Sequence, residues 1–290
     1  MKKIDQRQSF TLIELMTVIG IIAILAGLML VGYNIFFSEA NIGSSMRFDS
    51  SIHHSLGYAL VGDWKMDDNA ANSTVVDTSG NGNDGTFYSD GSEDNTANHS
   101  VDGANNRALS FDGDDYIDCG DKSDFDLADT DHTISLWYKT TAEDDLYLID
   151  KFTGGDSGAG YVISVGSGTI RYNERTTEEN SLSITKVVQN DNHWHHFLAT
   201  VDVSLKKGVL YSDGEKITTD EYAGNLINQN EPLKIGGGFW YWNGGIDQVR
   251  IYRAALSASQ IKQQYYTGLQ RLYKKGLISR EEYIKRVVRK

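Results

Sequence analysis

The stretch GVLYSDGEKI, residues 208–217, predicts two short β-strands joined by a tight turn. Asp213-Gly214 suits the two central positions of a type I′ turn, which require φ > 0 and join hairpin strands without splaying them. The runs SLW (135–137) and FLATV (197–201) have the apolar and β-branched content of strand cores. Together these runs predict an antiparallel sheet around the hairpin.

The rest of the chain body has the composition of an all-β domain. The 290 residues include 29 glycines and one proline, and short runs rich in Tyr, Trp, Val and Ile are separated by Gly/Asn/Asp clusters. That pattern is typical of a sandwich or barrel rather than of alternating β and α units. Because Cys119 is the single cysteine, no intramolecular disulfide can form, and the core has to hold the fold.

One strand of this body carries a carboxylate that needs a partner. In IDQVRIY (246–252), regular alternation places Asp247 on the same face as Val249 and Ile251. We therefore expect Asp247 to point into the sandwich.

The N-terminal stretch SFTLIELMTVIGIIAILAGLML (9–30) predicts a membrane helix. The 24 residues from Leu15 to Ser38 carry no charge. At about 1.5 Å per residue they span roughly 36 Å, more than a hydrocarbon core of about 30 Å. A cleaved secretory peptide has an apolar run of only about 7–15 residues. A plain signal anchor is the simpler alternative, but it does not explain Glu14, since an ionisable group in a membrane costs about 2.5–3.5 kcal/mol.

This segment resembles the N-terminus of type IV prepilins and pseudopilins. The resemblance implies a basic leader, residues 1–9, that a prepilin peptidase removes between Ser9 and Phe10, leaving Glu14 as the fifth mature residue. It also implies that Glu14 pairs with the methylated amine of Phe10 in a neighbouring pilin subunit. Two unit charges about 4 Å apart attract each other by roughly 4 kcal/mol at an effective dielectric of about 20.

By the same resemblance, residues 10–59 form a transmembrane and stalk helix of pilin type. The protein is then a single-pass membrane protein whose globular domain lies outside the cytoplasmic membrane, at the cell surface or on a pilus after processing. The sequence departs from the family pattern at Ser9, where glycine is usual, and at Val31, where proline is common.

Residues 60–268 resemble the laminin G-like, concanavalin A-like lectin/glucanase superfamily, which implies an all-β jelly-roll sandwich. The resemblance is carried by LVGDWKMDD (60–68), DTSGNGNDGT (77–86), ALSFDGDDYIDCG (108–120), HTISLWYKT (132–140), HWHHFLATVD (193–202) and GGIDQVRIYRAALSASQI (244–261).

A structural calcium ion is frequent in this superfamily. The resemblance implies that its ligands here are Asp77, Asn81 and Asn83 in one Gly/Asn/Asp loop, together with Asp247. Calcium takes about six to eight oxygen ligands from carboxylates, amides and carbonyls. A metal-free loop closed by Asx turns is the alternative.

The aromatic run Phe239-Trp240-Tyr241-Trp242 indicates a ligand site. Glycines flank the run, so it can protrude from the sandwich, where aromatic faces can bind sugar rings. We expect Trp242 to pack inside and Phe239, Trp240 and Tyr241 to be available to a ligand. A role in the core or at a subunit interface is the alternative.

The sequence contains no catalytic motif. Related glucanases place their carboxylates in a Glu-x-Asp-x-x-Glu run on one strand. This chain has no such run, and we expect its Glu174, Glu178 and Glu179 to lie in a polar loop. The histidines of HWHH (193–196) match the strand pattern of the superfamily, and we interpret them as structural. We therefore expect a protein that is not an enzyme.

Charge is distributed unevenly along the chain. The net charge is −13, but residues 271–290 carry +6 and the leader +2, which leaves −21 for residues 10–270. Binding to phosphate backbones relies on Lys and Arg, so we do not expect nucleic acid as a partner. In the basic tail, residues 269–290, Ser279 and Glu282 form a capping-box pattern, and Gly276 marks a break, which predicts a short helical hairpin.

These features predict a type IV pilin-like surface protein, a minor pilin or pseudopilin, that displays a laminin G-like module for adhesion or recognition. The expected ligand is carbohydrate or a surface glycoprotein. The alternative is an assembly subunit of a pilus, or of a type II secretion-like machine, with no glycan ligand.

Overall fold

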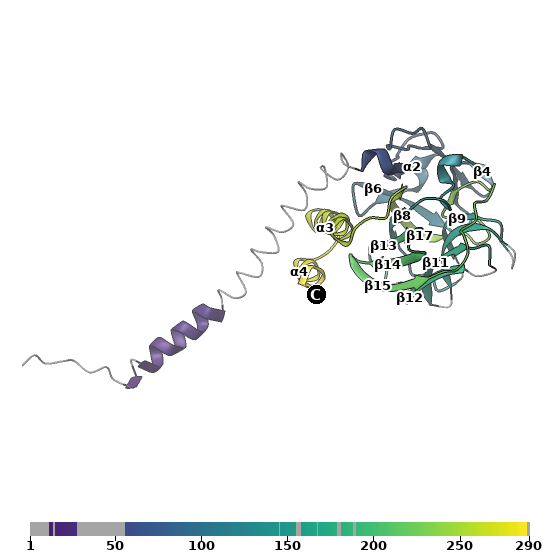
Figure 1. Cartoon of the computed structure of the whole chain (residues 1–290). Helices are drawn as coiled ribbons and strands as arrows, with labels where there is room; N and C mark the ends of the chain where they lie inside the picture. Colours follow the sequence, from purple (N-terminus) through teal and green to yellow (C-terminus); the bar gives the residue numbers. More distant parts are fainter. Residues whose placement is uncertain are drawn as a thin grey trace, which may run out of the picture.

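A computed structural model describes residues 12–13, 15–27, 56–144, 146–154, 158–166, 168–178, 181–187 and 190–288 (Figure 1). Leu12–Ile13 and the stretch 15–27 are helical. Within these ranges, no helix has both the length and the apolar character needed to cross a membrane. The processing residues Ser9, Phe10 and Glu14 lie outside the described residues, so their assignment stays a prediction.

The body of the chain is a sandwich of two antiparallel sheets, as predicted. In the described residues, sheet A has eight strands, in the order β15 (Glu215–Glu221), β14 (Lys207–Ser212), β13 (His195–Asp202), β8 (His132–Lys139), β17 (Asn243–Tyr252), β6 (Arg107–Asp112) and β5 (Ser100–Asp102), with β1 (Leu60–Trp64) beside β17. Sheet B has nine, in the order β12 (Ser181–Val187), β11 (Thr169–Arg175), β10 (Gly160–Gly166), β9 (Leu146–Phe152), β16 (Lys234–Ile235), β7 (Tyr116–Asp118), β3 (Gly85–Ser89) and β2 (Thr74–Val75), with β4 (Ser92–Glu93) beside β3. Among the described residues, the short helix η1 (Gly57–Ala59) precedes β1, and the short helices α2 (Thr96–His99) and η2 (Ser123–Phe125) lie between strands.

The main hydrophobic core fills the space between the two sheets. Its largest fully buried side chains are Trp64, Phe87, Phe111, Phe125, Tyr138, Tyr172, Phe197 and Trp242. Burying a large apolar side chain contributes roughly 1.5–3 kcal/mol, so this core is a main source of the stability of the sandwich.

The hairpin predicted from residues 208–217 is confirmed. β14 and β15 pair so that Ser212 lies opposite Glu215, and the two residues between them are Asp213 and Gly214. Their φ angles are 50° and 74°, which are the positive values that a type I′ turn needs.

β17 does not keep the regular alternation expected for IDQVRIY. Ile246, Val249 and Ile251 all lie in the inter-sheet core, because the pairing with β8 shifts between Asp247 and Arg250, where Gln248 has φ 53°. An extra residue in a bulge moves the following side chains to the other face. Asp247 therefore lies on the outer face of sheet A with its neighbour Trp137, and the expected inward orientation was wrong.

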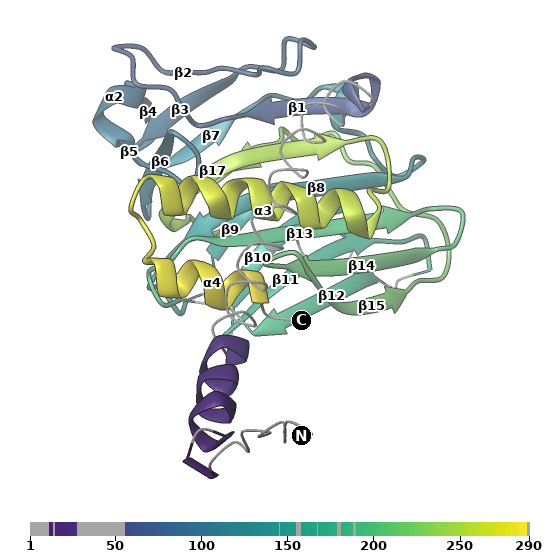
Figure 2. The same cartoon turned by 90° about the vertical axis from the view of Figure 1, so that its left-hand side faces the viewer.

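Two C-terminal helices, α3 (Ala258–Lys274) and α4 (Arg280–Val288), cover part of the outer face of sheet A, and α3 lies over β8, β13 and β17 (Figure 2). A capping box of Ser257 and Gln260 starts α3. The break between the helices includes Gly276 at φ 72°, and the Ser279 hydroxyl accepts a hydrogen bond from the amide of Glu282 in α4. The expected boundary between residues 268 and 269 falls inside α3.

The helical hairpin shares a second core with sheet A. Tyr265 stacks on Trp137 with ring centroids 5.8 Å apart, and a Cβ on Gly268 would overlap the Trp137 indole. Arg286 donates a 2.7 Å hydrogen bond to the carbonyl of Trp194. The basic C-terminal segment is therefore part of the folded domain rather than a solvated tail.

Candidate functional site

The loop between β16 and β17 presents the predicted aromatic residues on the outer side of sheet B. Phe239, Trp240 and Tyr241 are 62%, 53% and 37% exposed, whereas Trp242 is fully buried. The predicted division of the run, with Trp242 inside and the other three available at the surface, agrees with these exposures.

Glycines and backbone hydrogen bonds hold this loop against β9. The amide of Trp242 donates to the carbonyl of Gly236, and the amide of Tyr147 donates to the carbonyl of Trp240 at 3.3 Å. Gly238 has φ 149°, and a Cβ there would overlap the Asp150 carboxylate. The loop can therefore approach the strand closely only with glycine at this position.

A depression of about 370 Å³ lies beside Trp240, over strands β9, β10 and β11. It is lined by Tyr147, Phe152, Val162, Ser164, Val165, Arg171, Asn173, Glu174, Arg175 and Trp240. Its volume is at the lower end of the range of about 300–1,000 Å³ that is usual for small-molecule sites.

The polar lining comes from alternate residues of β11. Ile170, Tyr172 and Glu174 are buried, whereas the intervening Arg171 and Asn173 are half-buried on the outer face. Ser164 of β10 lies directly opposite Arg171. Since opposite residues share a face, the depression has hydrogen-bonding side chains on the β11 side and Trp240 on the β9 side.

Hydrogen bonds fix the Arg171 guanidinium in place. Its Nη2 donates to the carbonyl of Gly166 at 2.9 Å and to the Thr169 hydroxyl at 3.4 Å. Its Nε is buried and has no hydrogen-bond partner in the described part of the chain. Arg171 is thus oriented by hydrogen bonds within its own hairpin.

A second group of aromatic side chains extends the same face beyond the loop. The ring of Tyr241 lies 5.9 Å from that of Tyr116, which stacks on Tyr88 at 4.9 Å. The Lys234 ammonium is 5.3 Å from the centre of the Tyr116 ring, within the range of a cation–π contact. Aromatic surface therefore extends from the depression towards β7 and β3.

Asp150 lies beneath the aromatic loop. It is 6% exposed, and burial raises the pKa of its carboxyl to about 7, although the charge of Lys234 acts in the opposite direction. One carboxylate oxygen, Oδ1, has no hydrogen-bond partner in the described part of the chain.

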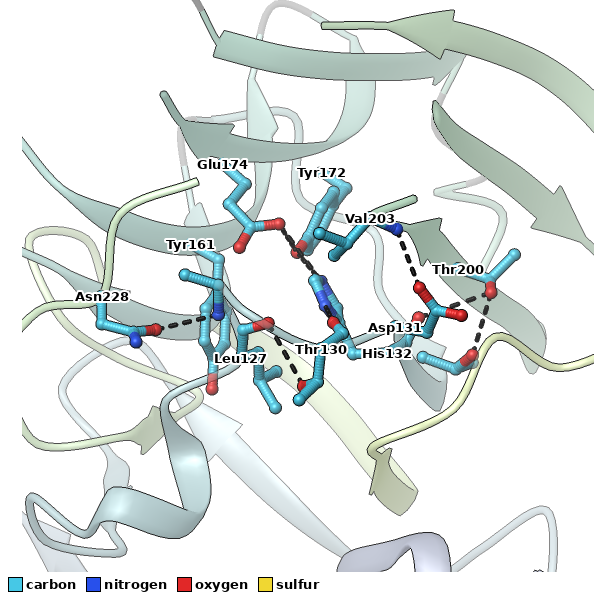
Figure 3. A network of polar contacts seen from close by, with 12 residues as sticks. Leu127, Thr130, Asp131, His132, Tyr161, Tyr172, Glu174, Thr200, Val203 and Asn228 are labelled. Carbon is cyan, nitrogen blue, oxygen red and sulfur yellow. Dashed lines mark hydrogen bonds and ion pairs between the residues drawn. The ribbon is translucent and has the colours of Figure 1, made fainter. Parts of the chain in front are cut away.

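Glu174 lies in β11, where it is 1% exposed (Figure 3). The prediction that it lies in a polar loop was therefore wrong. Its Oε2 lies 3.1 Å from Nε2 of His132 and accepts a 2.7 Å hydrogen bond from the Tyr172 hydroxyl. Because His132 belongs to β8, this contact joins the two sheets through the core. The side chain of Glu174 therefore faces the core, behind the depression.

The ion pair sets the protonation of His132. Burial alone lowers the pKa of His132, but the charge of Glu174, the hydrogen bond to it and the bond to the Thr130 carbonyl outweigh burial and raise the pKa above its ordinary value. No local pattern predicts this pair, because 42 residues separate His132 from Glu174.

The predicted calcium loop is closed by hydrogen bonds. The carboxylate of Asp77 accepts hydrogen bonds from the amides of Asp63, Ser79 and Asn83 and from the Ser79 hydroxyl, all at 2.7–2.9 Å. Asn81 and Asn83 donate through Nδ2 to backbone carbonyls of β1. A calcium ion on Asp77 would have to displace donors, so this arrangement resembles the Asx-turn alternative, and calcium binding stays a prediction.

Asp247, the fourth expected calcium ligand, has other partners. Its Oδ2 accepts a 2.7 Å hydrogen bond from the amide of Asn105, and no hydrogen bond of the described residues joins it to the Asp77 loop. Burial raises the pKa of Asp247 to about 8. The two ends of the domain are joined instead by the pairing of β1 with β17 and by a 2.9 Å ion pair between Asp63 and Arg250.

The histidines of HWHH have protein partners, in keeping with their structural interpretation. His195 lies 2.9 Å from Asp213 and 3.0 Å from Asp191. His196 packs against Trp137, and burial lowers its pKa to about 4.

Another depression, of about 510 Å³, lies beside the helical hairpin on the side of sheet A. Its lining includes Lys139, Asn192, Trp194 and Ile278. Trp194 is only 5% exposed, against 53% for Trp240, so this depression offers a ligand much less aromatic surface.

The chain belongs to the concanavalin A-like lectin/glucanases superfamily, whose laminin G family model matches residues 111–262. A second family model, the prokaryotic N-terminal methylation motif, matches residues 5–30. Both parts of the predicted fusion are thereby confirmed. No curated protein matches the sequence.

Solved structures with a similar fold include binding domains of clostridial toxins. The binding domain of Paraclostridial Mosquitocidal Protein 1 has a TM-score of 0.57 and 18% identity, over 74% of this chain and 53% of that one. The botulinum neurotoxin serotype D binding domain in complex with N-acetylneuraminic acid has a TM-score of 0.56 and 15% identity, over 74% of this chain and 52% of that one. The botulinum neurotoxin DC binding domain in complex with rat synaptotagmin II has a TM-score of 0.54 and 14% identity, over 73% of this chain and 52% of that one. This chain spans about half the length of each, and the likeness is one of fold.

Proposed function

We propose that this chain is a pilin-like surface protein, a minor pilin or pseudopilin, whose sandwich binds carbohydrate on the outer face of sheet B. The observation that carries the proposal is the exposed Trp240 at the edge of a depression lined by hydrogen-bonding side chains. Ligand sites combine aromatic surface with a few well-placed polar groups. We propose binding alone, without catalysis, as the activity of this face.

A sugar ring fits this combination of residues. The apolar C–H face of the ring would pack on the Trp240 indole, and its hydroxyls would exchange hydrogen bonds with Ser164 and Asn173. Among toxin domains of similar fold, one structure is a complex with N-acetylneuraminic acid and another a complex with a protein, synaptotagmin II. The exposed indole favours the sugar.

The N-terminal segment would anchor and assemble the protein. The methylation motif supports cleavage by a prepilin peptidase between Ser9 and Phe10 and insertion of the following helix in the cytoplasmic membrane. Glu14 would then pair with the amine of Phe10 on a neighbouring subunit, and the sandwich would be displayed outside. We keep calcium at the Asp77 loop as part of this proposal.

Binding of a glycan panel to the full chain in a non-ionic detergent tests the carbohydrate proposal. We expect at least one glycan to bind. Trp240→Ala should weaken binding about tenfold or more, if packing of a sugar ring is worth as much as the roughly 1–3 kcal/mol of a nucleobase stacked on an aromatic side chain. Val187→Ala, an exposed apolar residue on β12, is the control and should bind normally. Absence of glycan binding by a folded protein would favour the assembly subunit instead.

Replacing Glu14 by alanine tests the proposed assembly role. We expect Glu14→Ala to insert in the membrane and to be lost from filaments, because the neighbouring amine loses its counter-charge. Membrane fractionation and isolation of sheared filaments give the two readouts, with Thr17→Ala as a control in the same segment. Normal incorporation of Glu14→Ala would contradict this role.

A further inference from the structure

The depression beside Trp240 differs in charge from most of the domain. Residues 10–270 carry a net charge of −21, yet two arginines, Arg171 and Arg175, line this one depression. The acidic residue among its lining, Glu174, turns its carboxylate inward to His132. The charge that faces a ligand here is therefore positive, against the sign of the domain.

The guanidinium of Arg171 is held in an orientation that suits an anionic group. The carbonyl of Gly166 and the hydroxyl of Thr169 hold its Nη2, so little side-chain entropy is lost when a ligand binds. Its planar guanidinium presents donors in a fixed fork, which matches the two oxygens of a carboxylate. A neutral hydroxyl would use this arrangement less fully.

The distance between Arg171 and the loop that carries Trp240 is comparable to the length of a sugar residue. Arg171 is on β11, and the loop with Trp240 is bonded to Tyr147 at the start of β9, with β10 between them. Two strand spacings amount to roughly 10 Å. A sugar ring on the indole can therefore direct a substituent, or the next residue of the glycan, towards the arginines.

We propose that the ligand of this face is an acidic glycan whose carboxylate binds Arg171 and Arg175 while a sugar ring stacks on Trp240. This inference rests on the carbohydrate function proposed above and narrows it to glycans with uronic or sialic acid residues. The shared chemistry is a planar carboxylate on a pyranose ring.

Matched pairs of acidic and neutral glycans test the inference on the full chain in a non-ionic detergent. The pairs are 3′-sialyllactose with lactose, and trigalacturonic acid with its methyl ester, measured by isothermal titration calorimetry. We expect the acidic member of at least one pair to bind about tenfold or more tightly, with the preference reduced at high salt. The pair that shows the preference identifies the class of acidic sugar.

Variants assign the preference to the arginines. Arg171→Gln and Arg175→Gln should each remove most of the acidic preference, and Arg171→Lys, which keeps the charge but not the fork, should remove part of it. Lys216→Gln, on the exposed edge strand β15, removes the same charge elsewhere and should change nothing. Thermal melting of each variant shows whether it is folded.

The outcomes separate the inference from the function on which it rests. Equal binding of acidic and neutral members, still sensitive to Trp240→Ala, would overturn the acidic ligand and leave carbohydrate binding intact. Tight binding of lactose 3′-sulfate without binding of either carboxylate would also overturn it. Failure of the folded protein to bind any of these glycans, or any on the panel, would overturn both.

Discussion

The two outer faces of the sandwich both carry tryptophan side chains, but these are buried on one face and exposed on the other. On sheet A, Trp137 and Trp194 lie beneath α3 and α4 and are 3% and 5% exposed. On sheet B, Trp240 lies on a loop beside an open depression and is 53% exposed. An aromatic residue outside the inter-sheet core thus joins a second core where a helix covers it and stays available to a ligand where none does.

The largest expected effect comes from truncating one aromatic side chain on each face. Tyr265→Ala should lower the free energy of unfolding by about 3 kcal/mol or more, because it leaves a cavity against Trp137. Trp240→Ala should change it by only about 0.5 kcal/mol, as a surface substitution does. Urea unfolding followed by tryptophan fluorescence measures both. Similar losses from the two variants would contradict the division into a covered and an open face.

A pH-dependent effect of similar size is expected from the buried ion pair between His132 and Glu174, which joins the sheets behind these faces. Removing one partner of a buried pair costs roughly 3–5 kcal/mol when both are charged. Since the folded-state pKa of His132 is raised, the stabilisation is complete below its unfolded pKa of about 6.5 and is lost as pH rises through the raised value.

Comparison of the wild type with His132→Asn between pH 5 and pH 9 isolates this effect, because other titrating groups contribute to both. The difference in the free energy of unfolding should be largest at pH 5 and shrink towards pH 9. A difference that grows with pH would mean that His132 is neutral in the fold.

The smallest expected effect is that of calcium at the Asp77 loop. At about ten times its dissociation constant, calcium should stabilise the fold by about 1.4 kcal/mol and raise the melting temperature by roughly 3–6 °C. Asp77→Asn should abolish the shift. Asp112→Asn, in a separate cluster with Asp114 and Asp115 whose oxygens lie within 4.8 Å of one another, is the control. An unchanged melting temperature of the wild type with calcium and with chelator would exclude the ion.

Local sequence signals predicted the features that depend on neighbouring residues. The type I′ turn at Asp213-Gly214 follows from the φ angles these residues tolerate. The burial of Trp242 beside the exposed Trp240 was also predicted, from the resemblance, because the superfamily keeps an aromatic or aliphatic residue before the glycine-rich start of the last strand.

Features that depend on distant residues could not be predicted in the same way. Gln248 adopts φ 53° and forms a bulge in β17, which reversed the expected orientation of Asp247. Glu174 appeared polar and exposed until the fold brought it to His132, a residue of the opposite sheet. Arg171 was not singled out, because only the strand order places it across β10 from the aromatic loop. The signal that could have found it is the alternation of polar and apolar residues in TIRYNER (169–175).

The indole N–H signals of the protein distinguish a ligand on sheet B from one beside the helical hairpin. The sequence has five tryptophans, of which Trp64, Trp137, Trp194 and Trp242 are at most 5% exposed and Trp240 is 53% exposed. In ¹⁵N-labelled full chain, with Trp240 assigned by Trp240→Phe, we expect 3′-sialyllactose or trigalacturonic acid to shift the Trp240 signal and leave the other four in place. A shift of Trp194 instead would place the ligand beside the helical hairpin and contradict the account.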